Sequence, residues 1–178
     1  MQDLRSPSCE RFELSDHVGA ADSSAFQEAM SRVVSSVHIV TTNGSSGLAG
    51  ITASAVSSVS AEPPIMLFCI NRSSSSVERF LANRCFCVNT LAPCDQGLSD
   101  VFAGRTSERL DRRFATGAWK RAATGAPVLA TALAAFDCRL IEAREVLTHF
   151  IMLGMVEAIE ISSEPRALLY TRRRYAEI

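Results

Sequence analysis

Residues 50–60 have the sequence Gly-Ile-Thr-Ala-Ser-Ala-Val-Ser-Ser-Val-Ser, and prolines follow at positions 63 and 64. This run of apolar, β-branched and small hydroxyl residues is typical of a strand, so residues 48–60 are predicted to form one long strand. Gly44, Gly47 and Gly50 precede it in a loose GxxGxxG pattern. A dinucleotide-binding glycine loop must lead into a helix. Here the glycines lead into a strand, so a hairpin turn is the better interpretation.

A second hydroxyl-rich stretch, Asn71-Arg72-Ser73-Ser74-Ser75-Ser76, lies between an apolar run at 65–70 and a predicted helix at 76–83. The start of a helix offers free N–H groups and partial positive charge to an anion. The serine hydroxyls and Arg72 could complete a phosphate cradle there. An ordinary polar loop in front of a capped helix is the alternative. The sequence alone leaves both open.

The remaining helices and strands are predicted from the spacing of apolar residues and from the turn residues between them. Ser24 with Gln27, and Ser75 with Glu78, match the capping-box pattern at helix starts. Helices are predicted from residue 24, at 76–83, at 95–103 and around 107–112. Strands are predicted at 37–42, 48–60, 65–70 and 85–91, and within 132–145, 148–161 and 167–170. Helices inserted singly among strands favour a mainly β antiparallel barrel over a doubly wound sheet. Residues 1–22 are expected to be a lead-in, and residues 23–178 a single domain.

Composition excludes several classes of protein. The 178 residues carry a formal net charge of −1, without the basic surplus of a nucleic-acid binder. The N-terminus lacks the apolar core of a signal peptide, and the longest nearly apolar run, 126–136, is too short to cross a membrane. A cytoplasmic protein is therefore expected. Its six cysteines form no CxxC pair and its three histidines are scattered, so neither disulfides nor a metal site is expected.

No motif for self-contained acid–base or nucleophilic catalysis is present. The chain has no GxxxxGK phosphate loop and no GxSxG nucleophile elbow. No carboxylate pair stands out either. An enzyme that performs its own acid–base chemistry is expected to show more than this.

The order and spacing of several short blocks resemble the flavin reductase-like family, whose fold is the FMN-binding split barrel. The resemblance covers residues 26–175. The blocks that carry it are 50–60 with 63–64, 67–73, 87–91, 98–99, 102–104, 113–114, 119, 125–127, 136–138, 148–149 and 172–175. Within the family the chain looks closest to the reductase components of two-component aromatic monooxygenases, such as the 4-hydroxyphenylacetate and chlorophenol systems. A flavin reductase of pyrimidine degradation is similarly close.

The resemblance implies an enzyme that reduces FMN or FAD with NADH or NADPH and supplies the reduced flavin to a partner oxygenase. It also implies a homodimer. The implied flavin-binding residues come from four parts of the chain: Thr52, Ala53, Ser54 and Ser57; Asn71, Arg72, Ser73 and Ser75; Phe102, Ala103 and Gly104; Arg174 and Tyr175. The first group would hold the ring and ribityl chain, the second the phosphate, and the third a loop over the flavin. Arg174 and Tyr175 would reach the flavin of either subunit.

His149 would be the catalytic residue, on the nicotinamide side of the site, although a hydrogen-bonded strand histidine is the alternative. The family often has glycine before this Thr-His pair, and here the residue is Leu147. His38 is expected to lie in the core or at an interface. Two rival functions remain: an FMN carrier or sensor without turnover, and an oxidase of the pyridoxamine-phosphate type. The latter would need a further basic cluster for its substrate phosphate, and only residues 172–174 offer one.

Overall fold

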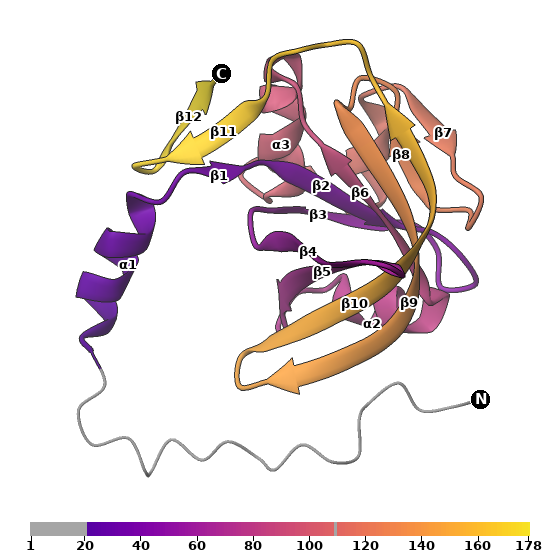
Figure 1. Ribbon diagram of the computed structural model, residues 1–178, viewed down its shortest axis with the longest axis horizontal. Coiled ribbons are helices and arrows are strands. Elements are labelled where there is room, and N and C mark those ends of the chain that lie inside the picture. The colour runs from indigo at the N-terminus through magenta and orange to yellow at the C-terminus, as the bar shows by residue number, and fades with distance from the viewer. Residues whose placement is uncertain (1–20, 109) are drawn as a thin grey trace.

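The computed structural model describes residues 21–108 and 110–178 (Figure 1). The predicted lead-in, 1–22, lies outside the described residues except for its last two. The rest is mainly antiparallel β-structure bordered by short helices, which confirms the predicted fold class. The helices are α1 (Ser23–Ser31), α2 (Val77–Asn83) and α3 (Gln96–Phe102), with 3₁₀ turns η2 (Pro93–Asp95) and η3 (Leu110–Ala115).

Seven strands form the main sheet, in the order β3-β2-β6-β9-β10-β5-β4, with every neighbouring pair antiparallel. Two smaller sheets, β1-β11-β12 and β7-β8, lie beside it. The strands are β1 (Ser35–Ser36), β2 (His38–Thr42), β3 (Ala49–Ala53), β4 (Val56–Ala61), β5 (Pro64–Asn71), β6 (Cys85–Thr90), β7 (Trp119–Arg121), β8 (Pro127–Leu129), β9 (Ala134–Val146), β10 (His149–Ile161), β11 (Leu168–Thr171) and β12 (Arg174–Glu177).

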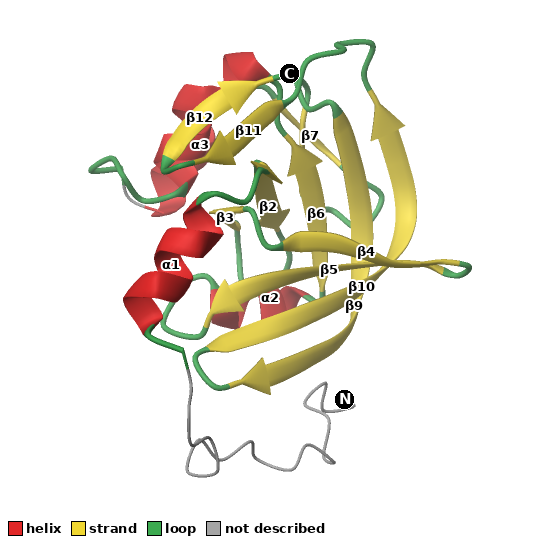
Figure 2. Ribbon diagram, turned by 60° about the vertical axis from the view of Figure 1, so that its left-hand side comes forward, coloured by secondary structure: helices red, strands yellow, loops and turns green. Residues whose placement is uncertain are grey.

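The two edge strands of the main sheet, β3 and β4, follow one another in the chain. Only Ser54 and Ala55 separate them. β3 pairs with β2, whereas β4 pairs with β5 at the other edge. The sheet therefore curls until its edges are joined by this two-residue corner (Figure 2). The prediction of one strand over 48–60 was wrong at this point, because the chain changes its hydrogen-bonding partner there while its residue types stay strand-like.

Aromatic packing fills the curled sheet. Phe68 lies against Phe80 of α2 and Phe86 of β6, with ring centroids 5.2 and 4.9 Å apart. A second cluster beneath α3 contains Phe102, which packs on Phe114 at 5.0 Å. A Cβ on Gly50 would lie 2.6 Å from Cε1 of Phe102. Glycine at position 50 therefore allows the end of α3 to rest directly on β3.

The two predicted capping boxes are wrong. The N-cap of α1 is Asp22, whose carboxylate accepts a hydrogen bond from the amide of Ala25 at 2.9 Å. The Ser24 hydroxyl donates to that same carboxylate. α2 begins after Ser76, which makes no side-chain capping bond. A charged acceptor two residues upstream thus takes the place predicted for Ser24.

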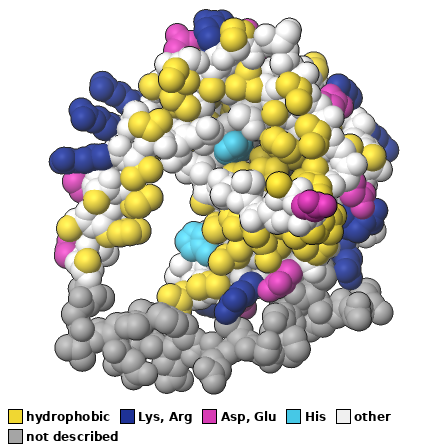
Figure 3. Space-filling model, viewed as in Figure 1, with side chains coloured by type: hydrophobic (Ala, Val, Ile, Leu, Met, Phe, Trp, Pro, Cys, Tyr) yellow, Lys and Arg dark blue, Asp and Glu magenta, His cyan; other side chains and the backbone are white. Residues whose placement is uncertain are grey.

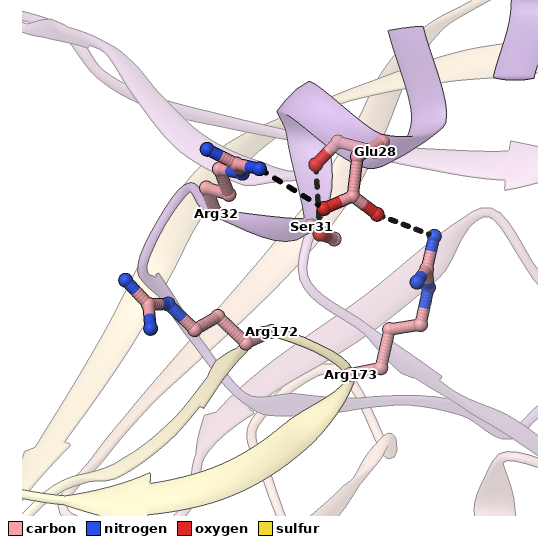
Figure 4. Close-up of a pocket in the computed structure, with 5 residues that line it drawn as sticks. All are labelled: Glu28, Ser31, Arg32, Arg172 and Arg173. Carbon is pink, nitrogen blue, oxygen red and sulfur yellow. Dashed lines mark hydrogen bonds and ion pairs between the residues drawn. The ribbon is translucent and has the colours of Figure 1, made fainter. Parts of the chain in front are cut away.

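Helix α1 stands beside the sheets (Figure 1). It buries none of its side chains. Its contacts are with the turn between β11 and β12. Glu28 pairs with Arg32 at 3.5 Å and with Arg173 at 3.2 Å, and the amide of Arg172 donates to the carbonyl of Ser31. Figure 4 shows these groups around a shallow hollow. The turn therefore fastens the C-terminal end of α1. In the described part of the chain, no helix is both long and apolar enough to cross a membrane.

Candidate functional site

A cleft of about 370 Å³ opens where the 54–55 corner meets the end of β5, the start of β10 and the end of α3. It thus brings together the two hydroxyl-rich stretches of the sequence. Its lining includes seven of the predicted site residues: Thr52, Ala53, Ser54, Asn71, Phe102, Ala103 and His149. Six further residues line it that were not predicted: Ile51, Ala55, Cys69, Ile70, Ser74 and Arg113.

The corner itself supplies backbone donors. Ser54 and Ala55 are exposed, and their carbonyls accept hydrogen bonds from Val56 and Cys69 at 3.0 and 2.9 Å. Within the described residues, neither of their N–H groups donates a hydrogen bond. Two adjacent unpaired amides at the wall of a cleft are ready to bind an acceptor oxygen or nitrogen. The switch of β-partner that splits the predicted strand thus exposes them.

Thr52 connects the corner to helix α3. Its hydroxyl donates to the carbonyl of Ser99 at 2.6 Å, and the amide of Ala103 donates to the same carbonyl at 2.9 Å. Phe102 is buried, whereas Ala103 and Gly104 are exposed. Gly104 has a φ of +71°, which glycine adopts without strain. The backbone therefore turns away immediately after α3 and leaves Ala103 at the wall of the cleft.

The stretch after β5 is ordered by its own side chains. Asn71 Oδ1 accepts hydrogen bonds from the amide of Ser73 at 2.9 Å and from its hydroxyl at 2.8 Å. Ser74 faces the cleft, and its hydroxyl accepts from the amide of Ser76 at 3.4 Å. Arg72 instead pairs with Glu145 at 3.2 Å, outside the cleft lining. Of the predicted cofactor residues, seven lie outside the lining in this chain: Ser57, Arg72, Ser73, Ser75, Gly104, Arg174 and Tyr175.

His149 begins β10, where it pairs with Asn71 of β5. Its Nδ1 lies 2.9 Å from the hydroxyl of Thr148, which fixes the ring beside the cleft. Leu147 precedes this pair in the two-residue turn between β9 and β10 and has a φ of +52°. The position where the family often has glycine thus has the left-handed backbone that favours glycine.

Comparison with known proteins agrees with this geometry. Residues 30–178 match the model of the flavin reductase like domain. The chain belongs to the flavin reductase-like family. It is 48% identical over 156 residues to the FMN reductase (NADH) RutF 1 of Methylorubrum extorquens strain PA1, covering 88% of this chain and 76% of that protein.

Solved structures of flavin reductases have the same fold as this chain. The YcdH protein of Haemophilus somnus 129PT superposes with a TM-score of 0.85 at 40% identity, covering 89% of this chain and all of that one. BorF, the flavin reductase component of a bacterial two-component tryptophan halogenase, superposes with a TM-score of 0.81 at 30% identity. That match covers 88% of this chain and 98% of BorF. The family and the fold expected from the resemblance are both confirmed.

Among the six lining residues that sequence reasoning missed, Arg113 is the charged one. It lies in one of the blocks that resemble the family, but no role was predicted for it. In a turn-rich segment, residue types do not indicate which way a side chain points. In this flavin reductase-like protein Arg113 lines the cleft, and its Nη1 donates to the carbonyl of Phe102 at 3.3 Å. Tyr175, by contrast, donates to Asp100 Oδ1 at 2.8 Å beneath the hairpin of β11 and β12.

His38 is buried in β2, as expected for a core residue, and its Nδ1 lies 3.1 Å from the hydroxyl of Thr90. Burial lowers the pKa of its imidazole to about 4, so the ring is neutral near pH 7. Among the described residues, no three of the His, Cys, Asp and Glu side chains gather closely enough to hold a metal ion.

Proposed function

We propose that this protein reduces FMN or FAD with NADH and supplies the reduced flavin to a partner oxygenase. The observation that carries the proposal is the meeting of residues 51–55 with residues 69–71 and Ser74 in a single cleft of a flavin reductase-like chain. A relative with 48% identity is an FMN reductase that uses NADH, and BorF is the reductase component of a two-component halogenase. The catalytic function therefore has more support than a carrier or sensor.

The donor set of the cleft fits a flavin nucleotide. The volume of about 370 Å³ lies within the roughly 300–1,000 Å³ common for small-molecule sites. Its wall offers the unpaired amides of Ser54 and Ala55, the Ser54 hydroxyl, the Asn71 amide and the cationic Arg113. Flavin and nicotinamide would supply the hydride chemistry, and the protein supplies position and electrostatics.

Six of the lining residues have a definite task under this proposal. The amides at the corner donate to the polar edge of the flavin ring, where negative charge grows on reduction. Thr52 holds the corner against α3 through the Ser99 carbonyl, so it positions the amides. Phe102 and Ala103 form the wall over the ring. His149 contacts the nicotinamide, and its hydrogen bond to Thr148 sets the ring orientation.

The residues outside the lining have other proposed partners. Ser73 and Ser75 are exposed next to Ser74 and would meet the flavin phosphate, together with Arg72 once it leaves Glu145. Ser57 and Gly104 would bound the two ends of the flavin. Arg174 and Tyr175 would act on the flavin of a second subunit. A homodimer belongs to the proposal, because α1 presents apolar side chains that its own chain leaves exposed.

A cytoplasmic location is also proposed, since NADH is supplied there and thiols stay reduced. The five cysteines described by the structure are all free thiols.

The deciding experiment is a steady-state assay that crosses FMN and FAD with NADH and NADPH, each flavin in large excess over protein. We expect many turnovers per protein with NADH. A bound flavin that is reduced once without turnover would support a carrier instead. His149→Ala should lower turnover more than flavin affinity, whereas equal turnover in variant and parent would remove His149 from the mechanism.

A further inference from the structure

We propose that Arg113 makes the cleft bind reduced flavin more tightly than oxidised flavin, through attraction to the negative charge that the ring gains. This inference rests on the proposed function. A hydride moves from the dihydronicotinamide ring to the flavin, so a C–H bond breaks, an N–H bond forms, and the two electrons stay with the flavin. The nicotinamide leaves as a cation and the flavin ring gains one negative charge.

One hydrogen bond to the backbone holds Arg113 in place. It lies in η3, and its Nη1 donates to the carbonyl of Phe102 at 3.3 Å. Its Nη2 lies 3.4 Å from the position that a Cβ on Gly104 would take. Its Nε is buried and has no hydrogen-bond partner among the described residues. The guanidinium is therefore fixed at the end of α3 with most of its five donors still free.

Arg113 carries a positive charge that no carboxylate of the described side chains neutralises. Among the described residues no carboxylate pairs with it, and the cleft lining contains no aspartate or glutamate. Two other arginines near the site differ in this respect. Arg72 pairs with Glu145 at 3.2 Å, and Arg105 pairs with Asp100 at 2.9 Å. Among the described residues, Arg113 is therefore an arginine of the cleft lining whose positive charge remains available to a ligand.

The surroundings of Arg113 strengthen its effect. It is half-buried, and apolar Phe102, Ile51 and Ile70 share the lining with it. Charges interact more strongly where water is partly excluded than in bulk solvent. A group that stabilises the flavin increasingly as negative charge develops on the ring assists the reaction more than a group that binds oxidised and reduced flavin equally. Arg113 therefore favours reduction and retains the product until it is handed on.

The test compares the affinities of Arg113→Gln, Arg113→Lys and wild-type protein for oxidised and reduced FMN, by anaerobic titration. Arg112→Gln is the matched control, because Arg112 lies in the same 3₁₀ turn, is exposed and lines no part of the cleft. Loss of a hydrogen bond to a charged group corresponds to about 10- to 100-fold in affinity. We expect Arg113→Gln to lose that much for reduced FMN and to bind oxidised FMN almost as wild type does. Lysine should restore most of the loss.

Riboflavin has the same ring without the phosphate, so it separates two kinds of contact. The proposal predicts the same selective loss with reduced riboflavin. An equal loss for both redox forms of FMN that is absent with riboflavin would assign Arg113 to the phosphate and overturn the proposal. Unchanged affinities in Arg113→Gln would overturn it as well. Wild-type protein that bound neither flavin would instead refute the proposed function.

Discussion

A single serine at position 54 occupies the point where the chain leaves one sheet edge for the other. Its side chain faces the cleft and is exposed, so it contributes little to the folding of the protein. We predict that Ser54→Leu weakens flavin binding at least about tenfold, because a bulky side chain displaces the ligand and a hydroxyl is lost. Fluorescence titration with FMN measures this. Ser58→Leu, on the exposed face of β4, should bind normally. Equal affinity of Ser54→Leu and wild type would refute the assignment.

His38 makes the stability of the fold depend on pH. Its pKa is about 4 in the folded protein and about 6.5 when unfolded. Above pH 6.5 the ring is neutral in both states. Between pH 6.5 and 4 only the unfolded chain takes up the proton, so stability falls as pH falls, by up to about 3 kcal/mol.

Urea unfolding at pH 7.5 and pH 5 tests this. Wild type should lose about 2 kcal/mol more than His38→Asn between the two values, because 1.5 pKa units separate pH 5 from pH 6.5. His149→Asn, at an exposed site, is the control and should follow wild type. Parallel profiles for wild type and His38→Asn would mean that His38 does not cause the loss.

Among the elements, the hairpin of β9 and β10 carries strain at its turn. Leu147 has a φ of +52°, which costs a non-glycine residue about 1 kcal/mol, and its side chain is 44% exposed. Leu147→Gly should therefore keep or raise the free energy of unfolding. Thr148→Gly, the neighbouring position without a positive φ, should lose about 0.5–1 kcal/mol through chain entropy. Thermal or urea unfolding distinguishes the two. Equal destabilisation by both substitutions would contradict the strain argument.

The elements also show what the sequence could predict. Long β-branched or apolar runs such as 85–91 and 148–161 were predicted as strands, and β6 and β10 confirm them. β1, β7 and β8 were missed because two or three residues are too few to display a period. The division of 48–60 was missed for a different reason. The pairing partner of a strand depends on residues far away in the chain, so it cannot be predicted from local residue types.

At the scale of the whole molecule, part of the site could likewise be predicted from the sequence and part could not. Resemblance to a family supplied Thr52, Ser54, Asn71 and His149, and the curled sheet brings all four to one cleft. The unpaired amides of the corner could not be inferred from side-chain types, because they exist only where two strand ladders end. Arg113 was missed because a turn-rich segment gives no periodicity from which to infer direction.

Helix α1 indicates how two molecules would associate. Phe26 and Met30, one helical turn apart, are 62% and 49% exposed, and hydrophobic side chains line this helix on the side turned toward the sheets (Figure 3). Burying such side chains contributes about 1.5–3 kcal/mol each. If a second copy of the chain covers this face, charged substitutions on the face should therefore strongly weaken the association of the two copies.

We predict that wild-type protein is a dimer and that the double variant Phe26→Asp, Met30→Asp raises the dimer dissociation constant at least about 100-fold, since each 1.4 kcal/mol corresponds to a factor of ten. Light scattering after size exclusion over a range of concentrations measures the change. Gln27→Asp adds a negative charge to the same helix at an exposed polar position, and it should remain dimeric. A monomeric wild type would contradict the dimer itself. A dimeric double variant would show that the subunits meet through another surface, since α1 contributes no buried side chain to its own core and its loss of apolar character cannot unfold the sheet.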